Sequence, residues 1–240
     1  MKVRRFKVGK FSRVLLVAVR RLPVAGCLLA LLWAASVGAQ DAARWENEIA
    51  AFEAADRTQP PPKDAIVFTG SSSIRLWTNL SEQFPDRKVI NRGFGGSHLT
   101  DAIVLTERII FPYQPRQVVI YTGENDIAAG KPGEEVAADF TVLFKKIRTR
   151  LPNTRITFIS IKPSPSRIEY LSEVREANQR IRKFLRGQRK ADFVDVFTGT
   201  LNAQGQPRVE WFREDSLHLN QQGYQHWAKV LKPYLVKTKD

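Results

Sequence analysis

The sequence has almost no cysteine. Of its 240 residues a single one is cysteine, Cys27, and it lies inside the N-terminal segment. A chain from which that segment has been removed contains no thiol and can form no disulfide. Cysteine usage therefore excludes a disulfide-stapled mature domain, and it neither supports nor opposes export.

Motifs that bind metals or nucleotides are also missing. The chain has no His-Glu-x-x-His, no cysteine pair and no dense cluster of His and Asp, which are the usual signatures of a metal site. It has no P-loop and no Gly-x-Ser-x-Gly elbow. We therefore expect no metal and no other cofactor.

Acidic residues are absent from the first 39 positions, which hold eight Lys and Arg. The net charge of +14 depends on this segment, because the remainder has 30 basic and 24 acidic residues and a net charge of +6. The remainder lacks a dense basic run with interleaved aromatic residues and any nucleic-acid-binding motif. We expect no nucleic-acid partner, although weak attraction to anionic cell-surface polymers is compatible with this charge.

The N-terminal segment has the parts of a secretory signal. Residues 1–21 are basic, and residues 22–39 carry no charge. Val37-Gly38-Ala39 then offers small residues to a signal peptidase. We predict that residues 1–39 are a signal peptide cleaved after Ala39. The domain is then periplasmic or secreted.

Three alternatives also place the domain outside the cytoplasm, and they differ in whether it stays attached to the membrane. An uncleaved segment of about 18 residues reaches about 27 Å, barely the thickness of a bilayer core, and its basic side would stay inside. Val24-Ala25-Gly26-Cys27 resembles a lipobox, which would lipidate Cys27, but the long apolar run follows this cysteine. Arg4-Arg5 is compatible with twin-arginine export.

The rest of the chain alternates between helical and strand-like patterns. Residues 41–56 place Trp45, Ile49 and Phe52 on one helical face, and three prolines at 60–62 end that helix. Apolar runs typical of strands fall at 65–69, 88–91, 117–122, 155–161 and 192–196. Helical patterns lie at 99–110, 134–150, 168–187 and 220–236, with a shorter helix after Ser73. This alternation predicts a parallel sheet covered by helices on both faces, in one domain at 64–240 preceded by a helix and Pro-rich linker at 40–63.

In such sheets, ligands bind beyond the carboxyl ends of the strands. The segments that follow strands are therefore the candidates for a site: 70–73, 91–98, 123–126 and 162–167, joined by the loop that ends at His218. A serine that opens a helix meets amides that stabilise an oxyanion, although serine runs also cap helices. Gly93-Phe94-Gly95-Gly96 lets a backbone N–H approach a ligand, or forms an ordinary turn. Asn125 would donate from its side-chain amide, or belong to a turn or helix cap.

Asp215 and His218 are the candidate acid and base. Three positions separate them, so one local turn places both on the same side, where the carboxylate orients the imidazole. The alternative is a surface pair near a helix start. The other histidines are His98, the main alternative base, which has no Asp at such a short spacing before it, and His226, inside the final helical pattern.

Taken in order, these segments resemble the sequence blocks of the SGNH/GDSL hydrolase family over about residues 64–236. The family's Gly-Asp-Ser reads Gly70-Ser71-Ser72, with Ser71 in place of the usual Asp. Gly96 matches the glycine of the second block. Gly123–Asp126 matches the third block, Gly-x-Asn-Asp, and Asp215 to His218 matches the last, Asp-x-x-His.

The resemblance implies a flavodoxin-like, three-layer α/β/α fold with about five parallel strands. It implies that Ser72 is the nucleophile, with Asp215 and His218 as its partners, and that the N–H groups of Ser72 and Gly96 and the Asn125 side chain form the oxyanion hole. The expected activity is hydrolysis of carboxylic esters through an acyl-enzyme, with an acetylated carbohydrate or a lysophospholipid as candidate substrate and no obligate protein partner. The alternative, favoured by the changed first block, is a non-catalytic module that binds cell-envelope carbohydrate.

Overall fold

The computed structural model describes residues 44–237. The predicted signal peptide, its cleavage after Ala39 and the alternative lipidation of Cys27 lie outside these residues. Between residues 44 and 237, no helix is long and apolar enough to cross a membrane.

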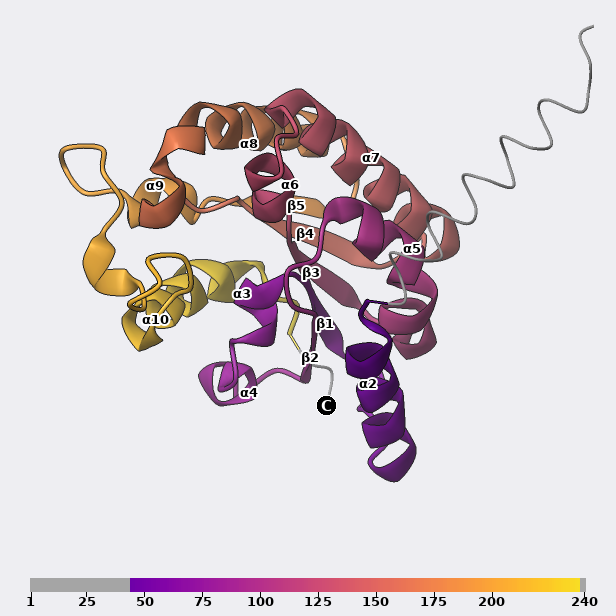
Figure 1. The fold of residues 1–240 in the computed structure, drawn as a ribbon. Helices are drawn as coiled ribbons and strands as arrows, with labels where there is room; N and C mark the ends of the chain where they lie inside the picture. The colour runs from indigo at the N-terminus through magenta and orange to yellow at the C-terminus, as the bar shows by residue number, and fades with distance from the viewer. Residues whose placement is uncertain (1–43, 238–240) are drawn as a thin grey trace, which may run out of the picture. The chain divides into compact units, whose positions relative to one another are not determined.

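A five-stranded, all-parallel sheet forms the centre of the described domain (Figure 1). Its strands are β1 (Ile66–Gly70), β2 (Val89–Gly93), β3 (Gln117–Tyr121), β4 (Arg155–Ile159) and β5 (Ala191–Val194). They lie in the order β2-β1-β3-β4-β5. The predicted parallel sheet of about five strands is confirmed. Because the chain first adds β2 on one side of β1 and then β3 on the other, the carboxyl ends of β1 and β3 form the crevice where ligands bind in folds of this order.

Helices cover both faces of the sheet, which gives the predicted three layers (Figure 1). One face carries α2 (Glu46–Thr58), α5 (Leu99–Ile109), α7 (Gly133–Arg150) and α8 (Leu171–Arg186). The other carries α3 (Ser72–Arg75), α4 (Leu80–Gln83) and α10 (Gln221–Leu231). The short α6 (Glu124–Ala128) and α9 (Phe197–Thr200) follow β3 and β5. Short 3-10 segments are found at Phe111–Tyr113, Pro165–Tyr170, Val209–Trp211 and Lys232–Tyr234.

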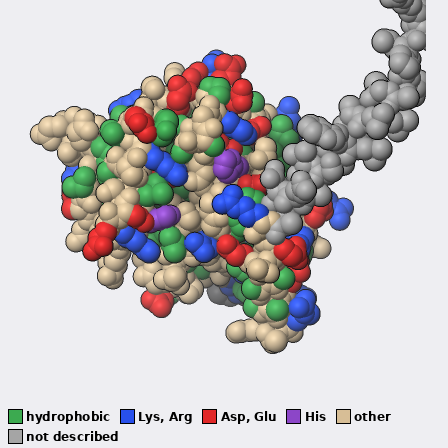
Figure 2. Space-filling model, in the orientation of Figure 1, with side chains coloured by type: hydrophobic (Ala, Val, Ile, Leu, Met, Phe, Trp, Pro, Cys, Tyr) green, Lys and Arg blue, Asp and Glu red, His purple; other side chains and the backbone are tan. Residues whose placement is uncertain are grey.

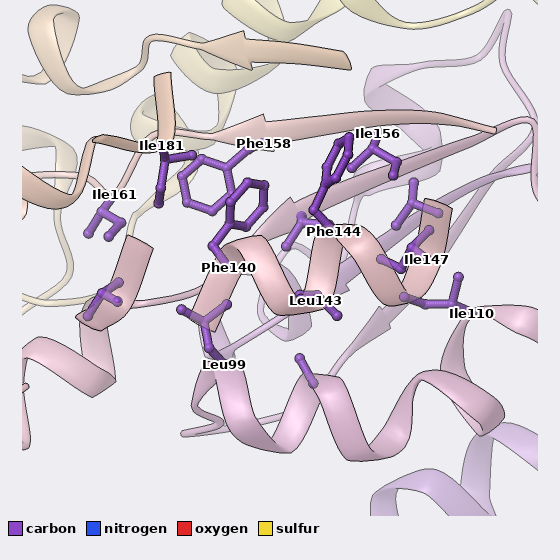
Figure 3. Close-up of a cluster of buried hydrophobic side chains, with 14 of the residues drawn as sticks. Leu99, Ile110, Phe140, Leu143, Phe144, Ile147, Ile156, Phe158, Ile161 and Ile181 are labelled. Carbon is purple, nitrogen blue, oxygen red and sulfur yellow. The ribbon is translucent and has the colours of Figure 1, made fainter. Parts of the chain in front are cut away.

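The core under α7 explains why this helix forms where it does. Phe140, Leu143, Phe144 and Ile147 recur every three or four residues and are buried on one face (Figure 3). The Phe140 ring lies 4.6 Å from that of Phe158 on β4, measured between centroids. Each fully buried side chain of this size stabilises the fold by about 1.5–3 kcal/mol.

The opposite core is rich in aromatic rings. The Trp77 ring lies 5.1 Å from Tyr224 and 5.9 Å from both Phe68 and Trp227, measured between centroids. The Tyr224 hydroxyl also donates to the Ser73 carbonyl at 2.8 Å. Helix α10 therefore packs against the sheet and is hydrogen-bonded to the first turn of α3.

The structure shifts several predicted boundaries. The pattern at 168–187 begins as a 3-10 turn and becomes α8 at Leu171, and the pattern at 220–236 ends as α10 at Leu231 before a 3-10 turn that contains Pro233. A proline cannot continue the hydrogen-bonding of an α-helix, which accounts for the second change. Helix α2 ends at Thr58, two residues beyond the predicted end.

Candidate active site

Ser72 lies just beyond the carboxyl end of β1, where Gly70 is paired with Tyr121 of β3. Gly70 ends β1 with a φ of +129°, and a Cβ at this position would lie 1.8 Å from the Tyr121 carbonyl oxygen. Only glycine fits both the left-handed conformation and this close approach. The Ser71 N–H then donates to the same Tyr121 carbonyl at 3.0 Å, and α3 begins at Ser72. The backbone thus turns sharply out of the sheet and presents Ser72 at the crevice.

His218 joins Ser72 to Asp215. The Ser72 Oγ lies 2.8 Å from His218 Nε2, and His218 Nδ1 lies 2.6 Å from Asp215 Oδ2. The other Asp215 oxygen, Oδ1, accepts the N–H groups of Leu217 and His218, both at 2.9 Å. This local turn, with Ser216 at a φ of +54°, is what lets residues three positions apart face each other.

The electrostatics favour a charged carboxylate beside the imidazole. Partial burial would raise the pKa of Asp215, but the hydrogen bonds from the His218 ring and from the His218 and Leu217 N–H groups lower that pKa to about 2. An ionised Asp215 accepts a hydrogen bond from His218 Nδ1–H, which leaves the Nε2 lone pair free to accept a hydrogen bond from the Ser72 hydroxyl.

The neighbouring serines differ from Ser72 in exposure. Ser71 and Ser73 are buried, with 3% and 2% of their surface exposed, whereas Ser72 is half-buried. Of the three, Ser72 is the one whose hydroxyl meets a histidine. The position at which the resembled family carries Asp is thus a buried one, and its serine makes its backbone contact with β3.

The loop after β2 is fastened to the start of α3. The Asn91 side chain accepts the Gly93 N–H at 2.9 Å and donates to the Ile74 carbonyl at 2.7 Å, while the Phe94 N–H donates to Gly70 at 2.9 Å. Gly96 has a φ of +68°, and its N–H has no acceptor among residues 44–237.

Asn125, the second residue of α6, reaches the same loop. Its Nδ2 donates to the Ser97 carbonyl at 3.0 Å, and its Oδ1 accepts from Arg167 Nη2 at 3.1 Å. An amide nitrogen carries two hydrogens, so one remains for another acceptor. Arg167 determines which end of the amide faces the loop, because it can only donate. Segment 162–167 was predicted to border the site, but this contact was not.

A buried ionic cluster lies next to Asn125. The Lys162 side chain is fully buried, with its Nζ 2.5 Å from Glu124 Oε2, which also accepts the Tyr121 hydroxyl at 2.7 Å. The Ser164 hydroxyl donates to the other Glu124 oxygen, and Arg167 Nη1 lies 3.8 Å from it. Burial would raise the pKa of Glu124, but the charges of Lys162 and Arg167 outweigh it and lower that pKa. Burial also lowers the pKa of Lys162.

Sequence reasoning did not identify this cluster. The sequence did contain a signal: Glu124 and Lys162 each lie three positions after the end of β3 or β4, and adjacent parallel strands bring their carboxyl ends together.

The other two histidines have different surroundings. His98 precedes α5, where its backbone N–H donates to Asp101 at 2.7 Å and its Nδ1 lies 3.8 Å from Asp126. The His226 ring lies against Trp211, 4.5 Å between centroids. Within the described residues, His218 alone makes the contact with Ser72 that a base requires. The same part of the chain holds no group of three or more His, Cys, Asp or Glu that could bind a metal.

Comparison with known proteins shows what the chain as a whole is similar to. A family model described as "GDSL-like Lipase/Acylhydrolase family" matches residues 61–226. Platelet-activating factor acetylhydrolase IB subunit alpha1 from Homo sapiens is 25% identical over 199 residues, which are 81% of this chain and 84% of that protein.

Solved structures share the fold. A GDSL-like lipase from Bacteroides thetaiotaomicron superposes with a TM-score of 0.66 at 18% identity, over 80% of this chain and 95% of the other. A family 3 carbohydrate esterase from Clostridium thermocellum superposes with a TM-score of 0.57 at 17% identity, over 72% of this chain and 95% of the other.

Proposed function

Because the chain belongs to the GDSL-like lipase/acylhydrolase family, we propose that it is a serine ester hydrolase that cleaves carboxylic esters through an acyl-enzyme formed on Ser72. One observation carries the proposal: the continuous hydrogen-bonded series from Ser72 Oγ through the two nitrogens of His218 to Asp215, with contacts of 2.8 and 2.6 Å. A nucleophile, a base and a group that orients the base are the parts that acyl transfer by serine requires.

Each step follows from these contacts. His218 Nε2 takes the Ser72 proton as Oγ attacks the ester carbonyl carbon, and Asp215 stabilises the imidazolium that forms. The carbonyl oxygen becomes an oxyanion, which accepts from the N–H groups of Ser72 and Gly96 and from Asn125 Nδ2. As the tetrahedral intermediate collapses, His218 gives its proton to the leaving alcohol.

Water then releases the acyl group. His218 takes a proton from the water molecule, the resulting hydroxide attacks the acyl carbon, and a second tetrahedral intermediate forms in the same oxyanion hole. Its collapse returns the proton to Ser72 Oγ and frees the carboxylic acid. Every proton in the cycle passes through Nε2, so the tautomer that Asp215 imposes is used in both acylation and deacylation.

The substrate class that we propose is an acetylated carbohydrate or a lysophospholipid, encountered outside the cytoplasm. The names of two relatives support it, one a carbohydrate esterase and one an acetylhydrolase of platelet-activating factor. The location rests on the signal-like N-terminal sequence. The alternative of a non-catalytic carbohydrate-binding module rested on Ser71, and this residue is buried, whereas Ser72 faces His218.

A fluorophosphonate probe tests the proposal, because it captures a serine made nucleophilic by its base. We expect the probe on Ser72, and we expect Ser72→Ala and His218→Ala each to abolish labelling. Ser71→Ala and His98→Ala are the matched controls and should keep most of it, with a thermal melt to show that each variant is folded. Labelling of Ser71 or Ser73 would contradict the assignment of the nucleophile. A folded, monodisperse protein that takes up no probe would favour the binding module.

A further inference from the structure

Helix α2 and the residue before it lie outside the family match, yet they bind the loop after β2. The Trp45 indole Nε1 donates to the Gly95 carbonyl at 2.6 Å, and the Gly95 N–H donates to Glu48 Oε2 at 3.1 Å. Both backbone polar groups of Gly95 are therefore held by residues that precede position 61, where the family match begins.

The geometry of a peptide bond extends this contact by one residue. The Gly95 carbonyl and the Gly96 N–H belong to the same peptide unit, which is planar and trans, so they point in opposite directions. A carbonyl directed at Trp45 fixes the Gly96 N–H to face away from Trp45. That N–H has no acceptor within residues 44–237, and it is a donor that the proposed reaction needs.

The Gly95–Gly96 peptide unit needs an external restraint. Neither residue has a side chain, and Gly96 already has a φ of +68°, so rotation of the unit meets little steric resistance. A half-turn of this unit would direct the Gly95 carbonyl oxygen to where the Gly96 N–H had pointed. The partial negative charge of that oxygen would then face the oxyanion of the substrate. A side chain on Gly95 cannot supply the restraint, because its Cβ would lie 2.8 Å from the Arg75 guanidinium carbon.

Trp45 is itself held in place. It is 3% exposed, and its ring meets the Phe94 ring edge-on with 5.6 Å between centroids. Ile49, one turn further along α2, is fully buried in the same core. Arg108 on α5 binds Glu46 and Glu53 of α2, each at 2.6 Å. The indole N–H therefore reaches Gly95 from a firmly docked helix.

We propose that Trp45, assisted by Glu48, is a positioning residue that holds the Gly95–Gly96 peptide unit with the Gly96 N–H directed at the oxyanion. This inference rests on the proposed function, and it extends the catalytic apparatus to a segment outside the family match. The bond from Gly96 forms only when negative charge develops on the substrate, so loss of the restraint lowers kcat and leaves KM nearly unchanged.

Trp45→Phe is the decisive variant, because phenylalanine keeps a ring against Phe94 and lacks the N–H. We expect kcat on p-nitrophenyl acetate to fall about tenfold to a hundredfold, with KM within about twofold of the wild type. Glu48→Ala should lower kcat in the same way, and Glu48→Gln, whose amide oxygen still accepts, should restore most of it. Asn125→Ala gives the reference for loss of one donor, about a hundredfold or more.

Ile49→Val is the matched control. It weakens the packing of the same helix without touching Gly95, so its kcat should equal that of the wild type at a temperature where thermal melts show every variant folded. A kcat of Trp45→Phe equal to that of the wild type would overturn the inference. So would a loss of kcat in Ile49→Val as large as that in Trp45→Phe, or a Trp45→Phe variant in which only KM changes. Failure of the wild-type protein to hydrolyse any ester would instead overturn the proposed function.

Discussion

Asp215 uses its two carboxylate oxygens for different purposes. One accepts two backbone N–H groups and shapes the turn, and the other holds the His218 ring. Its side chain remains 46% exposed, so water also stabilises the charge. These contacts explain why a surface carboxylate keeps a pKa of about 2. Its charge contributes to stability fully above the ordinary value of 3.8, and this contribution is lost as the pH falls through about 2.

This depressed pKa predicts the shape of the pH–rate profile. Because the pKa of Asp215 is lowered to about 2, its carboxylate stays charged well below neutral pH and should add no step of its own to the loss of kcat/KM on acidification. Log kcat/KM plotted against pH should then have a slope of one on the acid side. A limiting slope of two, in protein that remains folded by circular dichroism, would show that a second group titrates and would contradict the assignment.

The Lys162–Glu124 pair joins two elements, since Lys162 follows β4 and Glu124 begins α6. Through Arg167, the same cluster reaches Asn125. Replacing Lys162 by methionine leaves the Glu124 charge buried without its nearest partner. We expect Lys162→Met to lower the free energy of unfolding by about 3–5 kcal/mol in urea titrations.

A double-mutant cycle separates this loss from simple repacking. Lys162→Met combined with Glu124→Gln removes both charges and should recover much of the stability, because the two residues are directly coupled. Lys145→Met, at an exposed position on α7, should change stability by less than about 0.5 kcal/mol. Additive losses in the double variant would contradict the view that the ion pair is the source of the effect.

The contrast between local and distant contacts explains what the sequence could predict. The long helices have a clear period and the strands fall in short, mainly apolar runs, whereas α4, α6 and α9 have only four or five residues, too few for a period to emerge. The Asp215–His218 contact spans three positions and could be anticipated. The contact from Trp45 to Gly95 spans 50 positions and that from Lys162 to Glu124 spans 38, so each depends on the folded sheet.

For the chain as a whole, the basic N-terminal segment and the domain have different charge. The segment holds eight basic residues and no acid, and the remainder has a net charge of +6. On the face shown in Figure 2, basic and acidic side chains are interspersed and do not form one basic field. That no nucleic acid is bound stays a prediction from the sequence, which has no dense basic run.

Processing of the N-terminus is a prediction about the mature molecule. N-terminal sequencing of protein isolated from the cell envelope should begin at Gln40 or within a few residues of it, because the small residues before it suit a signal peptidase. Intact mass separates the alternatives, since lipidation would leave Cys27 as the first residue and an anchor would keep the whole segment. Recovery of the full-length chain from the cytoplasm would contradict export.

The position of Trp45 also bears on where the N-terminal boundary of this domain should be drawn. A gene fragment trimmed to the boundaries of the family match would begin at residue 61 and would encode the sheet, Ser72, Asp215 and His218 without Trp45 or Glu48. Such a fragment would carry every signature by which homology searches recognise the family and would lack the indole that fixes the Gly95 carbonyl. Grafting this core into a chimera, or exchanging it with that of a relative, therefore requires transferring the preceding helix with it.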